Sequence, residues 1–443
     1  MTLQAGSACV EITPEQSVPM SGYGARDESS SGVHDPLTAT ALVLTDGSTT
    51  VALVSVDLLN VSRALTTGVE RRLSAETNGV QVDELVLAAT HTHGGPYVPT
   101  QTIDIHPTLA VDEDLSWLLE DLECKISSVV VDAYERREPA SVRVGTATDD
   151  GTMVNRREAM GTRVPVSPDV VDREVSVMLV EGESGAETVL FTLACHPVSI
   201  TASDTELTAD WPGVVRREIQ AARGSDTTVL FLNGAAGDVT TRDHSVDADS
   251  KRGDDHHAYA TEMGQELAET VLEAVDDASA TPASARGPIL TDRRTLRLPV
   301  KSTPDLETLE ARERSLLETR DRLREDGHDE AAMRYDRDVS YVRELRAISA
   351  WGSRHVPARL QYVEVGSMGL LSFPGEALVQ HGLEFKAAAA VDNLFVTGYA
   401  TDYVGYLPTL RELENWGYEV RTAKVAPEAI VAFSEAGIDL VSR

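Results

Sequence analysis

Lysine is scarce in this chain: only five of its 39 basic residues are lysine, and arginine supplies the rest. Acidic residues number 72, which gives a formal net charge of −33. Such an excess repels nucleic acid and anionic membrane surfaces at low salt, so neither is expected as a partner. The acidic residues are spread along the chain, and an acidic surface with little lysine suits concentrated salt. We therefore expect a halophilic protein, with an ordinary acidic protein as the alternative.

Cysteine and long apolar runs are also scarce. The three cysteines Cys9, Cys124 and Cys195 lie far apart, and each has apolar neighbours. We expect them to be buried thiols in a reducing compartment. Residues 1–14 contain no basic region followed by an apolar run, and no later stretch approaches the ~20 apolar residues of a membrane span. These absences predict a cytoplasmic protein without a transmembrane segment.

Short apolar runs rich in β-branched residues alternate with helical patterns. Strands are expected at residues 41–44, 51–56, 85–89, 175–180, 189–193, 229–232 and 393–397, and helices at 114–137, 212–223, 257–275, 376–388 and 427–440. This alternation predicts an α/β fold with a large β-sheet core and flanking helices. The sheet should be mixed, because some strands are separated only by a turn. We find no internal repeat or low-complexity linker, so residues 1–443 are expected to form one catalytic domain.

Residues 303–349 differ from the rest of the chain. They are rich in Glu, Arg and Leu at helical spacing, with a break at residues 326–328. The pattern predicts a charged helical hairpin that leaves the main fold. A solvated excursion is the simplest interpretation, and a lid or a partner surface remains an alternative.

The strongest local motif is Thr-His-Thr-His-Gly-Gly-Pro at residues 90–96, directly after an expected strand. Residues two apart on a strand share a face, so His91 and His93 should point the same way. Two imidazoles at a strand end suit metal binding. Two further strand ends offer His196, before a proline, and Glu376, at an expected helix start. Two histidines and a glutamate form a known catalytic zinc set, although Glu376 could simply favour the helix dipole.

Six further segments resemble the neutral/alkaline ceramidase family in kind and order. They lie at residues 21–23 with 32–36 (SGY, GVHDP), 55–58 (SVDL), 155–156 (NR), 233–240 (NGAAGDVT), 401–406 (TDYVGY) and 416–419 (WGYE). The resemblance is to the N-terminal catalytic domain of that family and runs from about Gly6 to beyond Tyr418. It implies a halophilic archaeal-type member that lacks the family's C-terminal domain.

The resemblance implies a metal site and names its ligands. By position, His91, His196, Glu376 and Tyr406 would bind Zn²⁺. Tyr403 lies nearby, but the spacing from Tyr406 to the later tyrosine matches the family's. Tyrosine is an uncommon ligand, since its phenol loses a proton near pH ~10 unless a cation lowers that value.

A second group of residues is implied to act on the substrate. His93, Arg156 and Tyr418 would position the amide and stabilise its oxyanion. Thr240 stands where ceramidases have a serine, so it is a candidate catalytic residue. β-Branching restricts its hydroxyl, and we therefore favour zinc-activated water as the attacking group.

The expected function is that of a zinc-dependent amidohydrolase acting on an N-acyl substrate, ceramide-like or smaller. Aromatic residues make up 5% of the chain, and no apolar stripe for a long acyl chain is evident. The same site acting on an ester, a lactone or another C–N bond is one alternative, and a metal-containing binding protein without turnover is another. An assembly protein built around residues 303–349 would require the metal-like residues to be coincidental. A homo-oligomer is possible.

Overall fold

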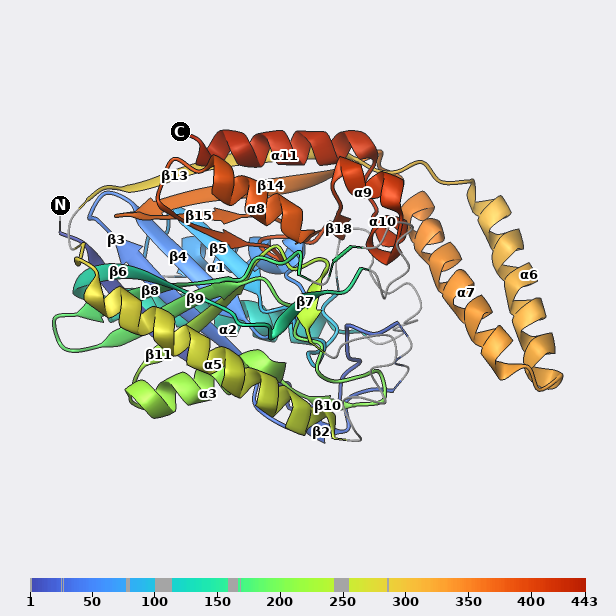
Figure 1. Cartoon of the computed structure of the whole chain (residues 1–443), viewed down its shortest axis with the longest axis horizontal. Helices are drawn as coiled ribbons and strands as arrows, with labels where there is room; N and C mark the ends of the chain where they lie inside the picture. The colour runs from blue at the N-terminus through green and yellow to red at the C-terminus, as the bar shows by residue number, and fades with distance from the viewer. Residues whose placement is uncertain are drawn as a thin grey trace.

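The chain folds into four layers, in the order helices, sheet, sheet, helices, with a helical hairpin projecting from one end (Figure 1). The computed structural model describes residues 2–443 except 25, 27, 77–79, 100–113, 158–165, 168, 243–254 and 285–286.

The larger sheet has eight strands and is mixed. In spatial order they are β11 (Thr228–Asn233), β9 (Glu187–Leu193), β8 (Glu174–Gly182), β6 (Glu138–Thr148), β1 (Gln4–Glu11), β3 (Thr38–Thr45), β4 (Thr50–Val56) and β5 (Glu84–Ala89). The pairs β4–β5 and β9–β11 are parallel, and the other neighbours are antiparallel. The prediction of an α/β fold with a large mixed sheet is confirmed.

The smaller sheet has four strands and covers one face of the larger one. Its order is β13 (Ile289–Pro299), β14 (His355–Val365), β15 (Met368–Ser372) and β17 (Asn393–Thr397). The expected strand at 393–397 therefore belongs to this second sheet. Three short pairs complete the strands: β2 (Gly32–Val33) with β10 (Glu206–Leu207), β7 (Met153–Asn155) with β12 (Val239–Thr241), and β16 (Glu376–Ala377) with β18 (Tyr406–Leu407).

Alternate residues of the central strands serve two different cores. On β3 and β4, Val43 and Val54 pack among residues of the helices α1 (Arg63–Glu76) and α2 (Ser116–Glu135). Their neighbours Leu42 and Leu53 face the smaller sheet, where they meet Leu370 of β15. Burial on both faces explains why these strands read as continuous apolar runs.

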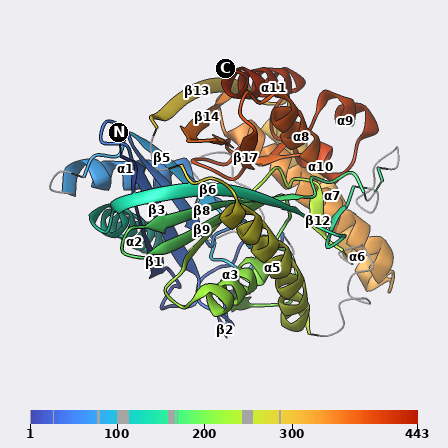
Figure 2. The same cartoon turned by 60° about the vertical axis from the view of Figure 1, so that its left-hand side comes forward.

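The remaining helices close the outer layers. α3 (Asp210–Arg223) and α5 (His256–Ala280) pack on the β8, β9 and β11 side of the larger sheet, and α8 (Val379–Ala388) and α11 (Pro427–Val441) cover the smaller sheet (Figures 1 and 2). Two short helices, α9 (Leu410–Asn415) and α10 (Tyr418–Thr422), lie near the hairpin. The expected helix at 376–388 begins only at Val379, because Glu376 pairs in β16.

The predicted hairpin is present as α6 (Leu306–Glu325) and α7 (Asp329–Ala350). Gly327, with φ 76°, turns the chain between them. The two helices share a small core, which includes Leu316 and Val342, and the buried Glu313 carboxylate pairs with Arg343 at 2.6 Å. Only the C-terminal part of α7 joins the main core, through Ile348.

Two of the three thiols are not where we expected them. Cys195 is buried, but Cys9 and Cys124 are exposed, and all three are free. Cys9 lies on β1, where the side chain of its neighbour Ala8 faces the core, and Cys124 lies on the outer side of the helix α2, whose buried residues include Leu122 and Ile126. Apolar neighbours in sequence therefore did not predict burial.

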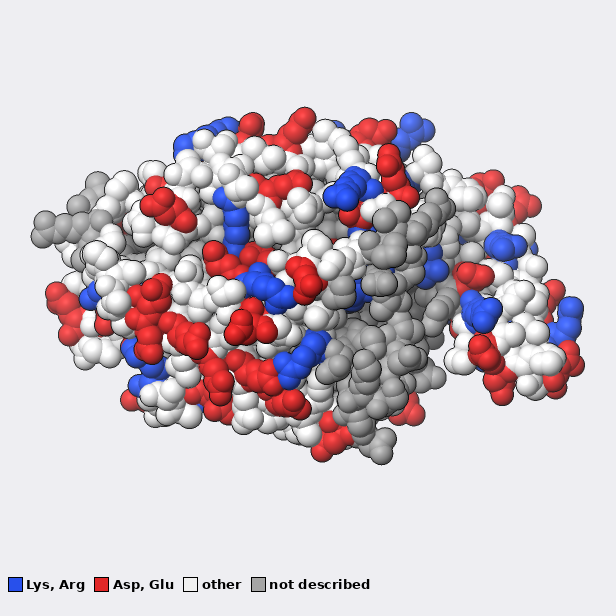
Figure 3. All heavy atoms as spheres, viewed as in Figure 1, with Lys and Arg blue, Asp and Glu red and all other residues white. Residues whose placement is uncertain are grey.

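The surface displays acidic side chains over the main body and the hairpin, interspersed with fewer basic ones on the face shown in Figure 3. Among the described residues, no helix is both long enough and apolar enough to span a bilayer.

Candidate metal centre

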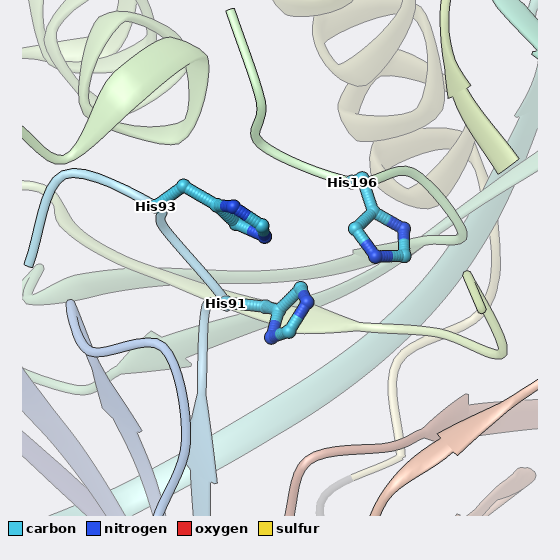
Figure 4. Close-up of side chains that lie close together, drawn as sticks. All are labelled: His91, His93 and His196. Atoms are coloured by element: carbon cyan, nitrogen blue, oxygen red, sulfur yellow. The ribbon is translucent and has the colours of Figure 1, made fainter. Parts of the chain in front are cut away.

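Three imidazoles from two strand ends point toward one another (Figure 4). His91 and His93 follow β5, and His196 follows β9. One nitrogen of each ring lies within 4.8 Å of the others. Because β4, β5, β9 and β11 deliver their carboxyl ends to this region, residues distant in sequence meet there.

His91 and His93 converge for a different reason from the one expected. β5 ends at Ala89, and His91 has a φ of 70°, so the two histidines are not neighbours on one strand face. The His91 amide donates to the Leu58 carbonyl at 3.0 Å, which holds the turn. The ring stacks on Tyr399 at a centroid distance of 4.1 Å, and Tyr399 itself has a φ of 55°. Left-handed residues other than glycine are costly, and here they cluster at the site.

The Nδ1 atoms of His91 and His196 both face backbone carbonyls. His91 Nδ1 lies 2.7 Å from the Leu59 oxygen, and His196 Nδ1 lies 2.6 Å from the Ala236 oxygen. Since a carbonyl only accepts, each Nδ1 must donate, and each Nε2 is left to face inward. Metal-binding histidines are commonly oriented by such a second hydrogen bond.

Glu376 supplies a carboxylate to both inward-facing nitrogens. Its Oε2 lies 3.0 Å from His196 Nε2 and 3.4 Å from His91 Nε2. Burial opposes the charged form of Glu376, but the two histidines outweigh burial and hold its pKa well below the usual value. Burial, reinforced by the charge of Arg156, lowers the pKa of His196 to about 4. Neutral imidazole lone pairs and a carboxylate at this spacing repel one another unless a cation lies between them, so these residues fit a divalent metal.

His93 lies against the same group as a half-buried residue whose two ring nitrogens are buried. Neither of its ring nitrogens has a hydrogen-bond partner among the described residues. Burial, with the charges of His91 and His196, lowers its pKa well below the usual value. A neutral imidazole with two unsatisfied nitrogens costs free energy unless a ligand or substrate meets it.

The parallel pairing of β16 with β18 brings a second chain segment to the site. Glu376 lies opposite Tyr406 in this pair. Tyr403, which the sequence presented as a competitor of Tyr406, donates its hydroxyl to Glu376 Oε1. Burial and the Glu376 charge raise the pKa of both phenols well above the usual value.

Arg156 reaches the site through its contact with Tyr406. Its guanidinium donates to the Tyr406 hydroxyl at 3.0 Å, to the Gly237 carbonyl at 3.1 Å and to Glu419 Oε1 at 3.2 Å. Burial alone would lower the pKa of Arg156, but its interactions with Tyr406 and with the carboxylates of Glu419 and Glu376 outweigh burial and raise the pKa. The guanidinium is therefore a fixed positive charge.

Tyr418 and Thr240 contact different members of this cluster. The Tyr418 ring meets Tyr406 edge to face at 5.8 Å, and burial raises the pKa of its phenol. Thr240 is fully buried in β12, where it bridges His196, and its hydroxyl has no hydrogen-bond partner within the described part of the chain.

A pocket opens in front of the cluster. It is lined by His91, His93, Glu376, Tyr406 and Tyr418, together with residues of α7. The structure thus brings all eight predicted site residues around one centre, five of them on the pocket wall.

Sequence reasoning missed several residues of the site. Tyr399 stacks on His91, and Glu419 pairs with Arg156. Glu419 follows Tyr418 directly in the Trp-Gly-Tyr-Glu segment, which was the available signal. Tyr399 offered no signal, because an aromatic after a strand is usually a core residue.

Comparisons with known proteins agree with this architecture. The family model for the N-terminal region of neutral/alkaline non-lysosomal ceramidase matches residues 4–257. Neutral ceramidase 2 of Arabidopsis thaliana is 26% identical over 250 residues, a stretch that covers 54% of this chain and 31% of that protein. The crystal structure of neutral ceramidase from Pseudomonas aeruginosa matches with a TM-score of 0.77 and 19% identity, covering 100% of this chain and 74% of that chain.

A second solved structure, a ceramidase complexed with C2, matches with a TM-score of 0.76 and 17% identity, covering 100% of this chain and 75% of that chain. At these identities the two structures establish likeness of fold. The family model ends before Glu376, so the carboxylate and the tyrosines are placed by the fold described above.

Proposed function

Because the chain belongs to the neutral/alkaline non-lysosomal ceramidase family, we propose that it is a zinc-dependent hydrolase that cleaves the amide bond of an N-acyl substrate. The observation that carries this proposal is the buried convergence of two inward-facing imidazoles on the Glu376 carboxylate. Ceramide-like and smaller N-acyl amides both belong to the proposed substrate class.

His91, His196, Glu376 and Tyr406 are the proposed ligands. The two imidazoles are already oriented by backbone carbonyls, and Tyr406 is brought in by β18. Zn²⁺ held there would polarise the substrate carbonyl and lower the pKa of a bound water from 15.7 toward ~7. A ligand set of imidazole nitrogens and oxygens without a thiolate suits zinc, and other divalent metals accept the same set.

The remaining residues are proposed to act on the substrate. Arg156 and Tyr418 present a fixed cation and a hydroxyl, which would stabilise negative charge on the amide oxygen. His93 is kept neutral by burial, so it can accept a proton and pass it to the leaving amine.

Metal analysis tests the ligand set. Purified protein should contain about one zinc per chain. His91→Ala and His196→Ala should each lose most of this zinc, because the ligands that remain bind the metal far less tightly. His381→Ala is a matched control, because His381 is a buried histidine that bonds the Pro408 carbonyl at 3.2 Å, away from the cluster. Full zinc in both site variants would contradict the assignment.

Thr240 is proposed not to be the nucleophile. Its hydroxyl is buried without a partner in the described structure, so Thr240→Val removes little that stabilises the fold. We expect Thr240→Val to retain amide hydrolysis within about threefold of the unmodified protein, a small effect by the usual scale of catalytic groups. A loss of about a hundredfold or more with zinc retained would instead make the hydroxyl a participant in the reaction.

Two alternatives use the same centre. An ester, a lactone or another C–N bond could be the target, and matched acyl amides and esters, assayed together, distinguish these reactions. A binding protein without turnover would retain zinc and bind acyl amides while releasing no amine. Retention of His93, Arg156 and Tyr418 beside the proposed ligands favours turnover.

The salt adaptation, the cellular compartment and the oligomeric state of the protein are also proposals. The net charge of −33 supports a halophilic protein with an acidic surface. The free thiols are consistent with a reducing cytoplasm. A homo-oligomer is a prediction that size measurement would decide.

A further inference from the structure

A second cluster of imidazole and carboxylate groups lies outside the candidate metal centre. His34 follows β2, Glu206 begins β10, and His257 lies in the first turn of α5. Figure 1 shows the start of α5 beside the short β2–β10 pair. One ring nitrogen or carboxylate oxygen of each residue lies within 4.8 Å of the others. None of the three lines the pocket in front of the proposed zinc ligands.

The backbone brings these residues together without the help of an ion. β10 runs parallel to β2, and the His34 amide donates to the Leu207 carbonyl at 2.8 Å. At the start of α5, the Asp255 carboxylate accepts from the Ala258 amide at 2.9 Å, and this cap fixes the turn that carries His257. Three separate chain segments therefore each supply one side chain to the same place.

The three side chains are available to a ligand. His257 Nδ1 is buried without a hydrogen-bond partner among the described residues, and its Nε2 lies 3.7 Å from Glu206 Oε2, beyond hydrogen-bonding distance. The His257 ring stacks on that of His34 at a centroid distance of 3.8 Å. The neighbouring His256 differs, because its Nδ1 is already bonded to Asp204 Oδ2 at 2.7 Å.

Two imidazoles and a carboxylate suit a divalent transition metal such as Zn²⁺ or Ni²⁺. Two zinc ligands bonded at about 2.1 Å in a tetrahedron are about 3.4 Å apart, so donors now within 4.8 Å need to close by about 1.4 Å at most. The stacked rings must also tilt so that their lone pairs converge, which the exposure of His34 permits. The positive end of the α5 dipole opposes a cation, and the capping Asp255 carboxylate at the same end offsets it.

We propose that His34, Glu206 and His257 bind a second divalent metal ion of the zinc or nickel class, with water on the exposed side. This ion would join β2 and β10 to the start of α5. The joined segments also lead to the zinc centre: the amide of Thr208, directly after β10, donates to the Gly94 carbonyl beside the pocket histidines at 3.0 Å. The second ion would therefore stabilise the loops around the proposed active site, whatever reaction that site performs.

The second ion should bind more weakly than the first. His34 and Glu206 are exposed and the imidazoles are stacked, whereas His91 and His196 are buried and already oriented by backbone carbonyls. Ligands that have to rearrange bind less tightly than ligands that are held in place. Dialysis against metal-free buffer should therefore remove the second ion, and the purified protein keeps about one zinc per chain.

Zn²⁺ titration of the dialysed protein by isothermal titration calorimetry tests the second site. The unmodified protein should take up one further ion per chain, and saturation should raise its Tm. His34→Gln, Glu206→Gln and His257→Gln should each weaken this uptake about tenfold or more, because each removes a ligand. Retention of the first zinc in these variants, measured by metal analysis, shows that they are folded. His256→Gln is the matched control and should take up the ion normally.

The outcomes separate the second site from the proposed zinc centre. No further uptake, or equal uptake by the three ligand variants and the unmodified protein, overturns the second site and leaves the zinc centre in place. Equal loss in His256→Gln overturns the assignment to these ligands. The double variant His91→Ala/His196→Ala should still bind one Zn²⁺ per chain, and adding His257→Gln should abolish it. That result in a protein purified without zinc would support the second site and contradict the zinc centre.

Discussion

Single side chains are held at this site by contacts that leave no room for change. Gly22 shows this most directly, because an added Cβ would lie 2.6 Å from the Cγ of His93. The backbone at Gly22 also has a φ of 102°, which other residues rarely adopt. The glycine therefore sets the position of the His93 ring in the pocket.

Gly22→Ala should displace His93 and lower amide hydrolysis about tenfold or more, since misplacing a reacting group by an ångström has effects of this size. Steady-state kinetics with zinc quantified in the same sample is the measurement. Gly47→Ala is the matched control: Gly47 has a φ of 90°, and nothing lies within 4 Å of its Cβ position. Equal losses in the two variants would show that backbone strain, rather than the His93 contact, is responsible.

At the scale of elements, the two sheets are joined by a turn as well as by their core. Asp46, between β3 and β4, accepts hydrogen bonds through Oδ1 from the amides of Ser48 at 2.7 Å and Thr49 at 2.9 Å. Its Oδ2 accepts from the amide of Ile289, the first residue of β13, at 2.9 Å. One carboxylate therefore fixes the hairpin of the larger sheet to the first strand of the smaller sheet.

This turn should make stability depend on pH. Burial opposes the Asp46 charge, but the bonds from Thr49, Ile289 and Ser48 outweigh it and lower the pKa from 3.8 to about 2. A lowered pKa means that the folded state binds the proton less readily, so the stabilisation is complete above the unfolded value and is lost as the pH falls toward the folded value.

Asp46→Asn should therefore lower the free energy of unfolding by about 1–3 kcal/mol at pH ~6, and the difference from the unmodified protein should narrow at pH ~3. Urea unfolding at both pH values measures it. Asp150→Asn, at an exposed position, is the control, and its free energy of unfolding should differ little from that of the unmodified protein at either pH. If the difference in free energy of unfolding between Asp46→Asn and the unmodified protein stays constant with pH, the carboxylate charge is excluded as its cause.

The hairpin illustrates how an element acquires a role from its surroundings. α6 and α7 stabilise each other through their own small core, and the tip of the hairpin projects from the body (Figure 1). Only near Ile348 does α7 pack into the main core, and this anchoring directs Glu344 into the pocket. Charge composition alone could not reveal that one helix end is buried.

For the whole molecule, the net charge of −33 is the dominant long-range term. Like charges destabilise the compact state, and the repulsion weakens as salt shortens the screening length from ~10 Å at 0.1 M to ~3 Å at 1 M. Buried pairs such as Arg216–Asp57, at 2.8 Å, are screened less than exposed ones.

Raising KCl from about 0.1 M to about 2 M should therefore raise Tm by roughly 5 °C or more, which corresponds to a few kcal/mol in a chain of this size. Differential scanning calorimetry measures it. The same titration near pH 4.6, the sequence pI, is the control, because the net charge is then small and the salt effect should shrink. An unchanged or falling Tm at neutral pH would contradict a halophilic protein.

The sequence by itself determined the α/β class, the positions of the most apolar strands and the segments that supply the site. Local patterns are sufficient for this, because strand runs buried on both faces, helix periodicity and motifs at strand ends are all properties of neighbouring residues. The same locality explains the errors: apolar neighbours suggested that Cys9 and Cys124 were buried, and a strand-face argument was applied to His91, where β5 has already ended.

Only the tertiary structure decided how distant segments meet. The second sheet, the pairing of Glu376 with Tyr406 and the approach of Glu344 and Lys424 to the pocket depend on packing between elements that are not neighbours in the chain. No local pattern encodes such distances, because they follow from the burial of complementary faces. That is why the sequence named eight site residues, while the contribution of α7 to the pocket became visible only in the folded chain.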